Sequence, residues 1–368
     1  MRYLSGIQPS GVLHIGNYFG AIRQHIRSQD EHDSYYFIAD YHALTTVRDA
    51  EVLREHVLGV ALDYLALGLD PEKTTFFRHS EVPEVQELAW ILSTLTPMGL
   101  LERCHSYKDK TAKGIAPDHG LFAYPVLMAA DILIYDSNKV PVGKDQIQHI
   151  EVTRDIAQRI NHVYGKGQEL LVIPEAQVEE STAVVPGIDG QKMSKSYENT
   201  LEMFASEKKL KKTIGKIVTD SRTPEEPKDP EEIIMYQLYR LFASEQELEA
   251  MAERYRAGGY GYGDAKKDLL EKLLDYFAPY RKKREELAGD PGGVYEILSA
   301  GAARARETAQ VTVERVYKAV GLRCSSLKLR SRTAPCRPAP GRASRVPRRR
   351  PFAVGRDRHP RRWSLPPG

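Results

Sequence analysis

The feature that most constrains the fold is the alternation of short apolar segments with helical patterns across residues 1–204. Residues 3–7 and 35–39 are apolar runs of strand length, and residues 76–77 indicate a third strand. Between them, residues 53–65 place apolar side chains three and four positions apart, which is the spacing of an amphipathic helix. Strands that alternate with helices are typical of a parallel sheet wrapped by helices. We therefore predict an α/β fold for this part of the chain.

Further elements continue the same alternation. The patterns predict helices at about residues 85–95, 124–135 and 145–164, with a short strand at residues 139–143 before the last of them. The polar segment at residues 98–118 is too long for an ordinary connection, so we interpret it as an inserted element.

The strand pattern disappears after this α/β part. Helical spacings remain, such as that of Leu269, Leu273 and Phe277, so we predict a separate all-helical domain at residues 205–322. The last segment, residues 323–368, holds 8 of the 22 prolines and 13 arginines against one acidic residue. It has almost no apolar periodicity and cannot bury enough surface to fold. We therefore predict a disordered basic tail.

Two interpretations of this tail stay open. It is either an electrostatic arm for RNA or an artefactual, frame-shifted extension whose Arg and Pro content reflects the coding DNA. The abrupt change of composition after Leu322 favours the second. Residues 1–322 alone carry 39 basic and 49 acidic side chains. Because phosphate binding depends on local patches, the overall charge neither supports nor excludes RNA as a partner.

Cysteine content and hydropathy exclude several other classes. The three cysteines, Cys104, Cys324 and Cys336, form no CxxC pair, so neither zinc nor a disulfide framework is predicted. No stretch of about eighteen apolar residues occurs, and the N-terminal residues lack the pattern of a signal peptide. We therefore expect a cytoplasmic protein that has no membrane span.

The first motif is the segment Ser-Gly-Ile-Gln-Pro-Ser-Gly-Val-Leu-His-Ile-Gly-Asn at residues 5–17. Its glycines lie where the first strand turns into a helix that we expect to begin at about Gly16. Backbone N–H groups and the positive end of the helix can there approach a polyphosphate. His14 and Asn17 stand three residues apart and can both face that ligand. On this motif alone, a tight turn with His14 as a helix cap is an equal alternative.

The second motif is Lys-Met-Ser-Lys-Ser at residues 192–196, which follows the glycine-containing segment at residues 187–190. Two lysines and two hydroxyl groups on a mobile loop suit a leaving pyrophosphate, because its negative charge grows as the bond to the α-phosphate breaks. A solvated basic loop is the alternative interpretation.

Together the two motifs resemble the two ATP-binding signatures of the class I aminoacyl-tRNA synthetases, in the order and separation of that family. The first motif ends in Asn17 where most members carry a second histidine, a variation that the tryptophan-specific members share. The resemblance covers residues 1–322 and implies a Rossmann-type nucleotide-binding domain that uses ATP with Mg²⁺. It also implies a helical domain that reads the tRNA anticodon, and a homodimer.

The resemblance implies an ATP site residue by residue. Four residues are expected to bind phosphate groups and so to carry catalysis: His14, Asn17, Lys192 and Lys195. Lys110, from the inserted segment, would join them unless it belongs to an exposed charge cluster. The implied ATP contacts are Gln8, Pro9, Ser10, Gly16, Asn17, Gly143, Lys144, Asp145, Val185, Lys192, Met193, Ser194, Lys195 and Ser196.

Amino-acid recognition is predicted on the helix at residues 124–135. Spacings of four, three and one place four side chains on one face of it, namely Tyr124, Met128, Asp131 and Ile132. A carboxylate on such an apolar face costs free energy unless it is paired. The indole N–H, which can only donate, would be a suitable partner for Asp131. A salt bridge or a turn cap is the alternative for an isolated aspartate.

This helix resembles the segment in which the tryptophan-specific synthetases bind the indole nitrogen with an aspartate. Met128 stands where the tyrosine-specific enzymes usually carry glutamine, and therefore favours tryptophan. Leu4 departs from the aromatic residue that some members carry. The implied tryptophan-binding residues are Gly6, His42, Tyr124, Met128, Asp131, Ile132, Val140, Val142 and Gln146.

The sequence thus predicts a ligase that activates L-tryptophan with ATP, releases pyrophosphate and transfers the aminoacyl group to tRNA(Trp). The attacking carboxylate is already ionised near neutral pH, so the first step needs no general base. The alternatives are a tyrosine-specific synthetase, a small-molecule adenylyltransferase with the same glycine–histidine turn, and a synthetase-like protein without catalysis. The last should have a damaged motif, whereas His14, Lys192 and Lys195 are all present.

Overall fold

The structure, a computed structural model, describes residues 2–104, 107–108, 118–143, 146–178 and 185–323. All of the described residues lie in the first of two units, Met1–Ser325. Of the tail predicted at residues 323–368, residues 324–368 lie outside the described residues, as do Lys110, Lys144 and Asp145. The predictions for all of these stay predictions.

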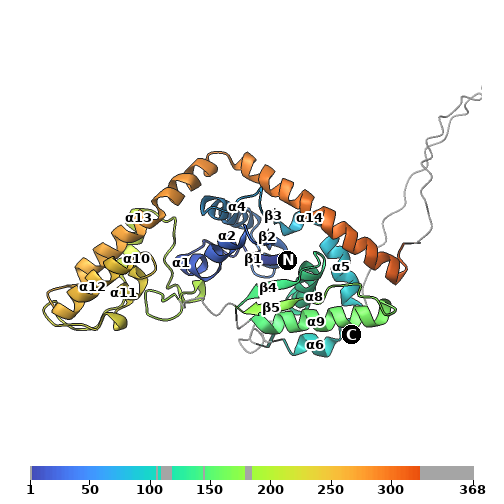
Figure 1. The fold of residues 1–368 in the computed structure, drawn as a ribbon, viewed down its shortest axis with the longest axis horizontal. Helices are drawn as coiled ribbons and strands as arrows, with labels where there is room; N and C mark the ends of the chain where they lie inside the picture. The colour runs from blue at the N-terminus through green and yellow to red at the C-terminus, as the bar shows by residue number, and fades with distance from the viewer. Residues whose placement is uncertain (1, 105–106, 109–117, 144–145, 179–184, 324–368) are drawn as a thin grey trace, which may run out of the picture. The chain divides into compact units, whose positions relative to one another are not determined.

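A five-stranded sheet forms the centre of the first unit (Figure 1). Its order is β3-β2-β1-β4-β5, and every neighbouring pair is parallel. The chain builds outward from β1 to β3 on one side and then returns to place β4 on the other side of β1. Ligands of open α/β sheets bind at such a reversal, outside the carboxyl ends of the strands. The strands are β1 (Arg2–Ile7), β2 (Asp33–Ile38), β3 (Thr75–Arg78), β4 (Lys139–Val142) and β5 (Glu175–Val178).

The predicted α/β fold with a parallel sheet is confirmed. The first four strands fall at the predicted positions, to within two residues at each end. β5 was not predicted, because its sequence Glu-Ala-Gln-Val has no apolar run. It lies at the edge of the sheet, where a strand pairs on one side and can carry polar side chains.

Helices cover both faces of the sheet. Successive side chains of a strand point to opposite faces, so each strand contributes to the core on both sides. Tyr36 and Phe76 pack on one face in a cluster that includes the apolar side of α4 (Ala50–Ala66). Leu4 and Phe77 pack on the other face. The helices of this second face are α5 (Glu84–Ser93), α8 (His119–Leu133) and α9 (Ile147–Tyr164).

Two helices begin earlier than predicted. α8 begins five residues before its predicted start, because Asp118 accepts a hydrogen bond from the backbone N–H of Leu121 at 2.8 Å. The helix after β1 begins with α1 (Ile15–Asn17), one residue before its predicted start. It continues through the π-helical turn η1 (Tyr18–Ile22) into α2 (Arg23–Ser28).

The described residues from 205 to 323 are helical and contain no strand, as predicted. α13 packs against α4, and α14 packs against β3 and α5. The division into a domain at residues 1–204 and another at 205–322 stays a prediction. The helices of this part are α10 (Glu207–Gly215), α11 (Ile234–Tyr239), α12 (Glu245–Ala257), α13 (Tyr262–Ala288) and α14 (Pro291–Val320), with the 3₁₀ turn η5 (Pro230–Glu232) before α11.

The last helix, α14, lies directly against the sheet (Figure 1). A Cβ atom at Gly301 would lie 1.9 Å from the carbonyl oxygen of Phe76 in β3, so only glycine permits this approach. Ala302, Ala305 and Ala309 of the same helix are buried in the second core cluster. None of the described helices combines the length and the hydropathy that a membrane span requires.

Candidate active site

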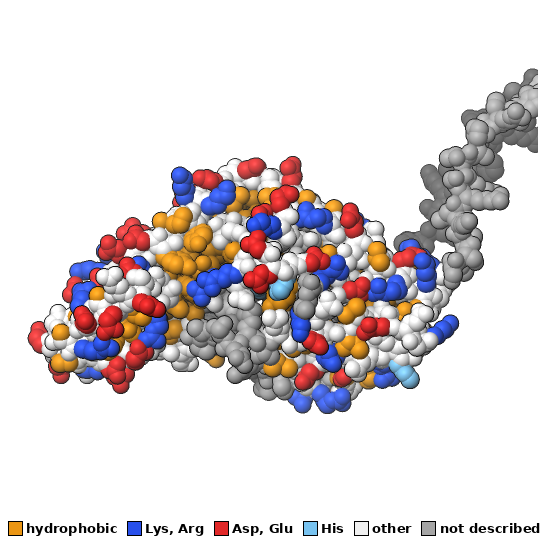
Figure 2. All heavy atoms as spheres, viewed as in Figure 1, with side chains coloured by type: hydrophobic (Ala, Val, Ile, Leu, Met, Phe, Trp, Pro, Cys, Tyr) orange, Lys and Arg blue, Asp and Glu red, His pale blue; other side chains and the backbone are white. Residues whose placement is uncertain are grey.

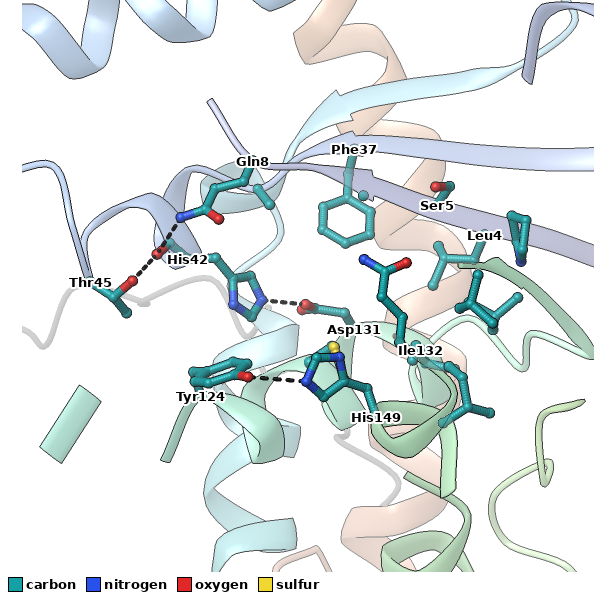
Figure 3. A pocket seen from close by; sticks show the side chains of 18 of the residues that line it. Leu4, Ser5, Gln8, Phe37, His42, Thr45, Tyr124, Asp131, Ile132 and His149 are labelled. Carbon is teal, nitrogen blue, oxygen red and sulfur yellow. Dashed lines mark hydrogen bonds and ion pairs between the residues drawn. The ribbon is translucent and has the colours of Figure 1, made fainter. Parts of the chain in front are cut away.

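A cavity of about 360 Å³ opens near the carboxyl ends of β1, β2 and β4 (Figure 3). The reversal of strand order predicts a ligand site there, and the volume is in the range of pockets for small molecules. Its lining includes all nine residues predicted to bind tryptophan: Gly6, His42, Tyr124, Met128, Asp131, Ile132, Val140, Val142 and Gln146. The other lining residues are Leu4, Ser5, Gln8, Phe37, Ala39, Thr45, Thr46, Pro141, His149 and Ile150.

Gly6 makes room for an aromatic wall. β1 and β2 pair so that Gly6 stands opposite Phe37. A Cβ atom at Gly6 would lie 2.5 Å from Cζ of Phe37, so a larger residue would displace the ring. The ring therefore lies across β1 and lines the cavity (Figure 3). Sequence reasoning named Gly6 but missed Phe37.

Asp131 places a buried carboxylate in the wall of the cavity. The residue is 1% exposed, and its Oδ2 lies 2.7 Å from Nε2 of His42. Its Oδ1 lies 2.7 Å from Nε2 of His79. Figure 3 shows His42 and Asp131 facing each other. The ion pair considered as an alternative for Asp131 is thus present, and the same carboxylate also lines the cavity.

The two histidines keep Asp131 ionised. Burial alone would raise the pKa of Asp131, but the charges and contacts of His79 and His42 lower it to about 2. Burial also opposes the charged form of His79, yet Asp131 outweighs it and raises the pKa of that histidine. An ionised carboxylate can only accept hydrogen bonds. The cavity therefore presents a fixed acceptor to a ligand that carries an N–H group.

His42, His79 and Asp131 could together hold a metal ion, the one such group among the described residues. Ligand atoms around tetrahedral zinc lie about 2.0–2.1 Å from the ion and therefore about 3.3 Å from one another. The 2.7 Å between His42 and Asp131 is instead the length of a charge-assisted hydrogen bond. The distances favour a histidine–aspartate network, and the absence of zinc stays a prediction.

Sequence reasoning also missed His79 and His149. His79 begins the short turn η2 (His79–Glu81) directly after β3, whereas His42 lies in α3 (Asp40–Ala43) directly after β2. Polar residues that follow neighbouring parallel strands meet at one edge, so this signal was available for His79. His149 Nε2 lies 3.1 Å from Oη of Tyr124, a contact between α9 and α8 that no local pattern announces.

His14 stands at the start of α1, in the N-cap position that the alternative interpretation gave it. The backbone N–H of His14 donates to Oδ1 of Asn17 at 3.0 Å. Burial, and then the charge of Lys195, lower the pKa of His14 to about 4, so its imidazole is neutral near pH 7. Nδ1 of His14 is buried and has no hydrogen-bond partner among the described residues. A Cβ at Gly16 would lie 2.9 Å from it, so the glycine gives the ring its space.

The two motifs lie together in the structure. Lys195 donates through Nζ to the carbonyl oxygen of Gly11 at 3.0 Å, across 184 positions of sequence. The backbone N–H of Ile15 donates to the carbonyl oxygen of Leu201 at 2.9 Å. Burial lowers the pKa of Lys195, although the nearby Asp63 acts in the opposite direction. The second motif therefore contacts the turn that contains the first motif, through the hydrogen bond from Lys195 to Gly11.

The loop of the second motif is organised by Asn199, which sequence reasoning missed. Asn199 accepts from the backbone N–H of Ser194 at 2.8 Å, and a Cβ at Gly187 would lie 2.3 Å from its Nδ2. Met193 donates its backbone N–H to the carbonyl oxygen of Val185 at 2.9 Å, and both side chains are buried in the core. The buried Met193 thus holds the loop against the core, while Lys192 and Lys195 on either side of it are more exposed.

The remaining predicted ATP contacts divide between two places. Gln8 lines the cavity, and beside it the backbone N–H of Gly143 donates to Oε1 of Gln146 at 3.3 Å. Residues 192–196 do not line that cavity. Of the others, Pro9 is buried, and Ser10, Lys192 and Ser196 are exposed.

The chain belongs to a known family of tRNA synthetases. Residues 1–278, more than half of the chain, match the family described as tRNA synthetases class I (W and Y). This confirms the class that the two motifs predicted.

Relatives narrow the assignment within that family. The tryptophan–tRNA ligase of Rhodopirellula baltica is 59% identical over 323 residues, which are 88% of this chain and 100% of the relative. That of Fusobacterium nucleatum is 54% identical over 321 residues, 87% of this chain and 98% of the relative. The chain therefore belongs with the tryptophan–tRNA ligases, as predicted.

Solved structures agree with this assignment. The tryptophanyl-tRNA synthetase of Campylobacter jejuni, complexed with ADP and tryptophan, matches with a TM-score of 0.84 at 52% identity, over 87% of this chain and 100% of that one. The tryptophanyl-tRNA synthetase of Mycoplasma pneumoniae matches with a TM-score of 0.72 at 30% identity, over 88% and 98%.

Proposed function

We infer that this chain activates L-tryptophan with ATP to give tryptophanyl-adenylate and pyrophosphate, and then transfers the tryptophanyl group to tRNA(Trp). One observation carries the inference: the chain matches the whole length of a tryptophan–tRNA ligase at 59% identity. The buried carboxylate of Asp131 in an otherwise largely apolar cavity supplies a chemical reason for tryptophan. An indole N–H only donates, and an ionised carboxylate only accepts.

The nine predicted tryptophan residues form the amino-acid pocket in this proposal. Met128, Ile132 and Val140 contact the faces of the indole ring, and Asp131 accepts its N–H. A phenol placed in the same pocket would leave this carboxylate facing a group of different length and direction. Selection of tryptophan over tyrosine therefore follows from one acceptor and the shape of the apolar walls around it.

ATP binds, in this proposal, at the turn after β1 and the loop of residues 192–196. His14 is neutral near pH 7, so it donates one N–H to a phosphate oxygen without adding charge. Lys195, which contacts Gly11 in the structure, supplies positive charge to the pyrophosphate as it leaves. Mg²⁺ enters with ATP as part of the substrate. The carboxylate of tryptophan attacks in its ionised form, so positioning and charge stabilisation carry the step.

We also propose that the chain acts in the cytoplasm as a homodimer, with residues 205–322 reading the tRNA anticodon. On the face drawn in Figure 2, basic and acidic side chains are interspersed. Such a face offers local rather than uniform attraction to phosphates. Sedimentation of the purified chain tests the dimer, and a single species of monomer mass at micromolar concentration would refute it.

Amino-acid-dependent exchange of pyrophosphate into ATP tests the activation step. Across all twenty amino acids, tryptophan should support exchange far better than any other. Exchange with tyrosine but not tryptophan would refute the assignment. Exchange without aminoacylation of tRNA(Trp) would instead indicate a small-molecule adenylyltransferase.

The basic tail has its own test. A chain that ends at Leu322 should aminoacylate tRNA as the full chain does, if the tail is an artefactual extension as we propose. Weaker tRNA binding by the shortened chain, with a shallower salt dependence, would support the RNA arm instead.

A further inference from the structure

His79 is a buried histidine that lies behind the wall of the amino-acid pocket. It is 1% exposed and does not line the cavity, yet its Nε2 lies 2.7 Å from Oδ1 of Asp131. The contact is short, although it is not well aligned along the N–H direction. The other ring nitrogen, Nδ1, has no hydrogen-bond partner among the described residues.

The two carboxylate oxygens of Asp131 are thus contacted by different histidines. The rings of His42 and His79 stack, with centroids 5.6 Å apart and planes inclined by 21°. His42 approaches Oδ2 and lines the cavity, whereas His79 approaches Oδ1 from the protein side. Figure 3 shows His42 and Asp131 at the cavity. The oxygen nearer the cavity is therefore Oδ2, and its second lone pair is the one that a ligand N–H can use.

The fold holds His79 in this place. Asp40, at the start of α3, accepts from the backbone N–H of Ser80 at 2.9 Å and from that of Tyr41 at 3.0 Å. This carboxylate joins the turn that carries His79 to the turn that carries His42. The ring of Tyr41 meets that of His79 edge to face, with centroids 5.0 Å apart. His79 therefore has little freedom to turn away from Asp131.

We propose that His79 is a positioning residue that sets the specificity for an indole N–H, by holding Oδ1 of Asp131 so that Oδ2 stays an acceptor facing the pocket. This inference rests on the proposed function. Without His79, Oδ1 would be a bare charge among aromatic side chains, and the carboxylate would turn or take up a proton. Either change weakens the acceptor that reads the N–H, while the apolar walls of the pocket remain.

A pair of variants with similar side-chain shape isolates this role. Gln at position 79 offers an amide N–H at a similar reach, whereas Met fills a similar volume and offers none. The substrates are tryptophan and β-(3-benzothienyl)alanine, in which sulfur replaces the indole N–H. Exchange kinetics for both give the preference for the N–H as a ratio of kcat/KM. We expect the unaltered chain to prefer tryptophan by about tenfold to a hundredfold.

In H79M this preference should fall to about threefold or less, through a higher KM for tryptophan and a nearly unchanged kcat. In H79Q it should stay within about threefold of the unaltered chain. H25L is the matched control, because His25 is also a buried histidine but packs on the other side of the sheet with Tyr36 and Tyr64. It should leave the preference unchanged. If H79M does not fold, H79A supplies the same comparison.

The outcomes separate the two proposals. Equal losses for tryptophan and the analogue in H79M or H79A, with the preference kept, would make His79 merely structural and overturn the inference. No preference in the unaltered chain would overturn it too, while leaving the ligase intact. A chain that fails to activate tryptophan at all would instead refute the proposed function.

Discussion

The packing of α14 against the sheet predicts that a glycine-to-alanine substitution changes the stability of the chain in opposite directions at two helical glycines. Gly301 in α14 and Gly59 in α4 both lie inside helices, where alanine is favoured over glycine by about 1 kcal/mol. A Cβ at Gly59 meets nothing within 4 Å. Gly59→Ala should therefore stabilise the chain by about 0.5–1 kcal/mol.

The same change at Gly301 places a methyl group 1.9 Å from the carbonyl oxygen of Phe76. An ordinary carbon–oxygen contact is about 3.3 Å, so the helix and the strand would have to separate by about 1.4 Å. Because the obstacle is backbone, no rotamer change relieves it. Overpacking of this kind costs about 1–3 kcal/mol or more. We expect Gly301→Ala to destabilise the chain by at least about 2 kcal/mol, despite its gain in helix propensity.

Urea unfolding followed by circular dichroism measures both free energies of unfolding. The two variants should differ by about 3 kcal/mol, with equal m-values if both keep the native fold. Equal stability of Gly301→Ala and the unaltered chain would mean that α14 does not lie against β3 as described. A loss in Gly59→Ala would contradict the assignment of open space around α4.

Three other predictions concern the site and its charges. Asp131→Ala should raise the KM for tryptophan by about tenfold to a hundredfold, the cost of losing a hydrogen bond to a charged group, and an unchanged KM in exchange assays would remove Asp131 from recognition. Lys195→Ala should lower the rate of adenylate formation in rapid-quench experiments by about a hundredfold or more with little change in tryptophan binding, and a loss confined to tryptophan binding would contradict its role at pyrophosphate. Burial, outweighing Arg284, raises the pKa of Asp63 to about 6, so the folded chain holds this proton more tightly than the unfolded chain. Its contribution to stability is present below about pH 4 and is lost as the pH rises through 6, by about 3 kcal/mol. Asp63→Asn should flatten that part of the pH profile of unfolding, and an unchanged slope would show that Asp63 is not the group responsible.

Local patterns were sufficient for most of the fold. Apolar runs and helical spacings depend on neighbours in sequence, so β1 to β4 and the main helices could be predicted. Of the nine predicted residues that line the cavity, four followed from one helix face and five from the resemblance to the tryptophan-specific enzymes. β5 could not be predicted, because an edge strand with polar side chains has no apolar run. The close approach of Gly301 to Phe76 joins positions far apart in sequence, and no local pattern encodes it.

The charge state of Asp131 could not be predicted from the sequence either. Asp131 on an apolar helix face predicted a ligand N–H as a partner, but the sequence could not name the protein side chains that pair with its carboxylate. The structure supplies His42 and His79, which follow different strands and meet at Asp131 because the parallel strands β2 and β3 end at the same edge. Asn199 is similar, since its role depends on a loop that closes back on Gly187. Residues that act through tertiary contacts with other functional residues are the ones that motif reasoning misses.

The helical part of the chain also contacts the segment that follows the second motif. Arg281 of α13 donates through Nη2 to the carbonyl oxygens of Met203 and Ala205, both at 2.7 Å, in the segment that follows the second motif. One turn further along α13, Nε of Arg284 lies 2.6 Å from Oδ1 of the buried Asp63 in α4. α13 therefore contacts both the segment that follows residues 192–196 and α4, which covers one face of the sheet. We therefore expect a shift of α13 to change these contacts and, with them, the geometry of the loop at residues 192–196.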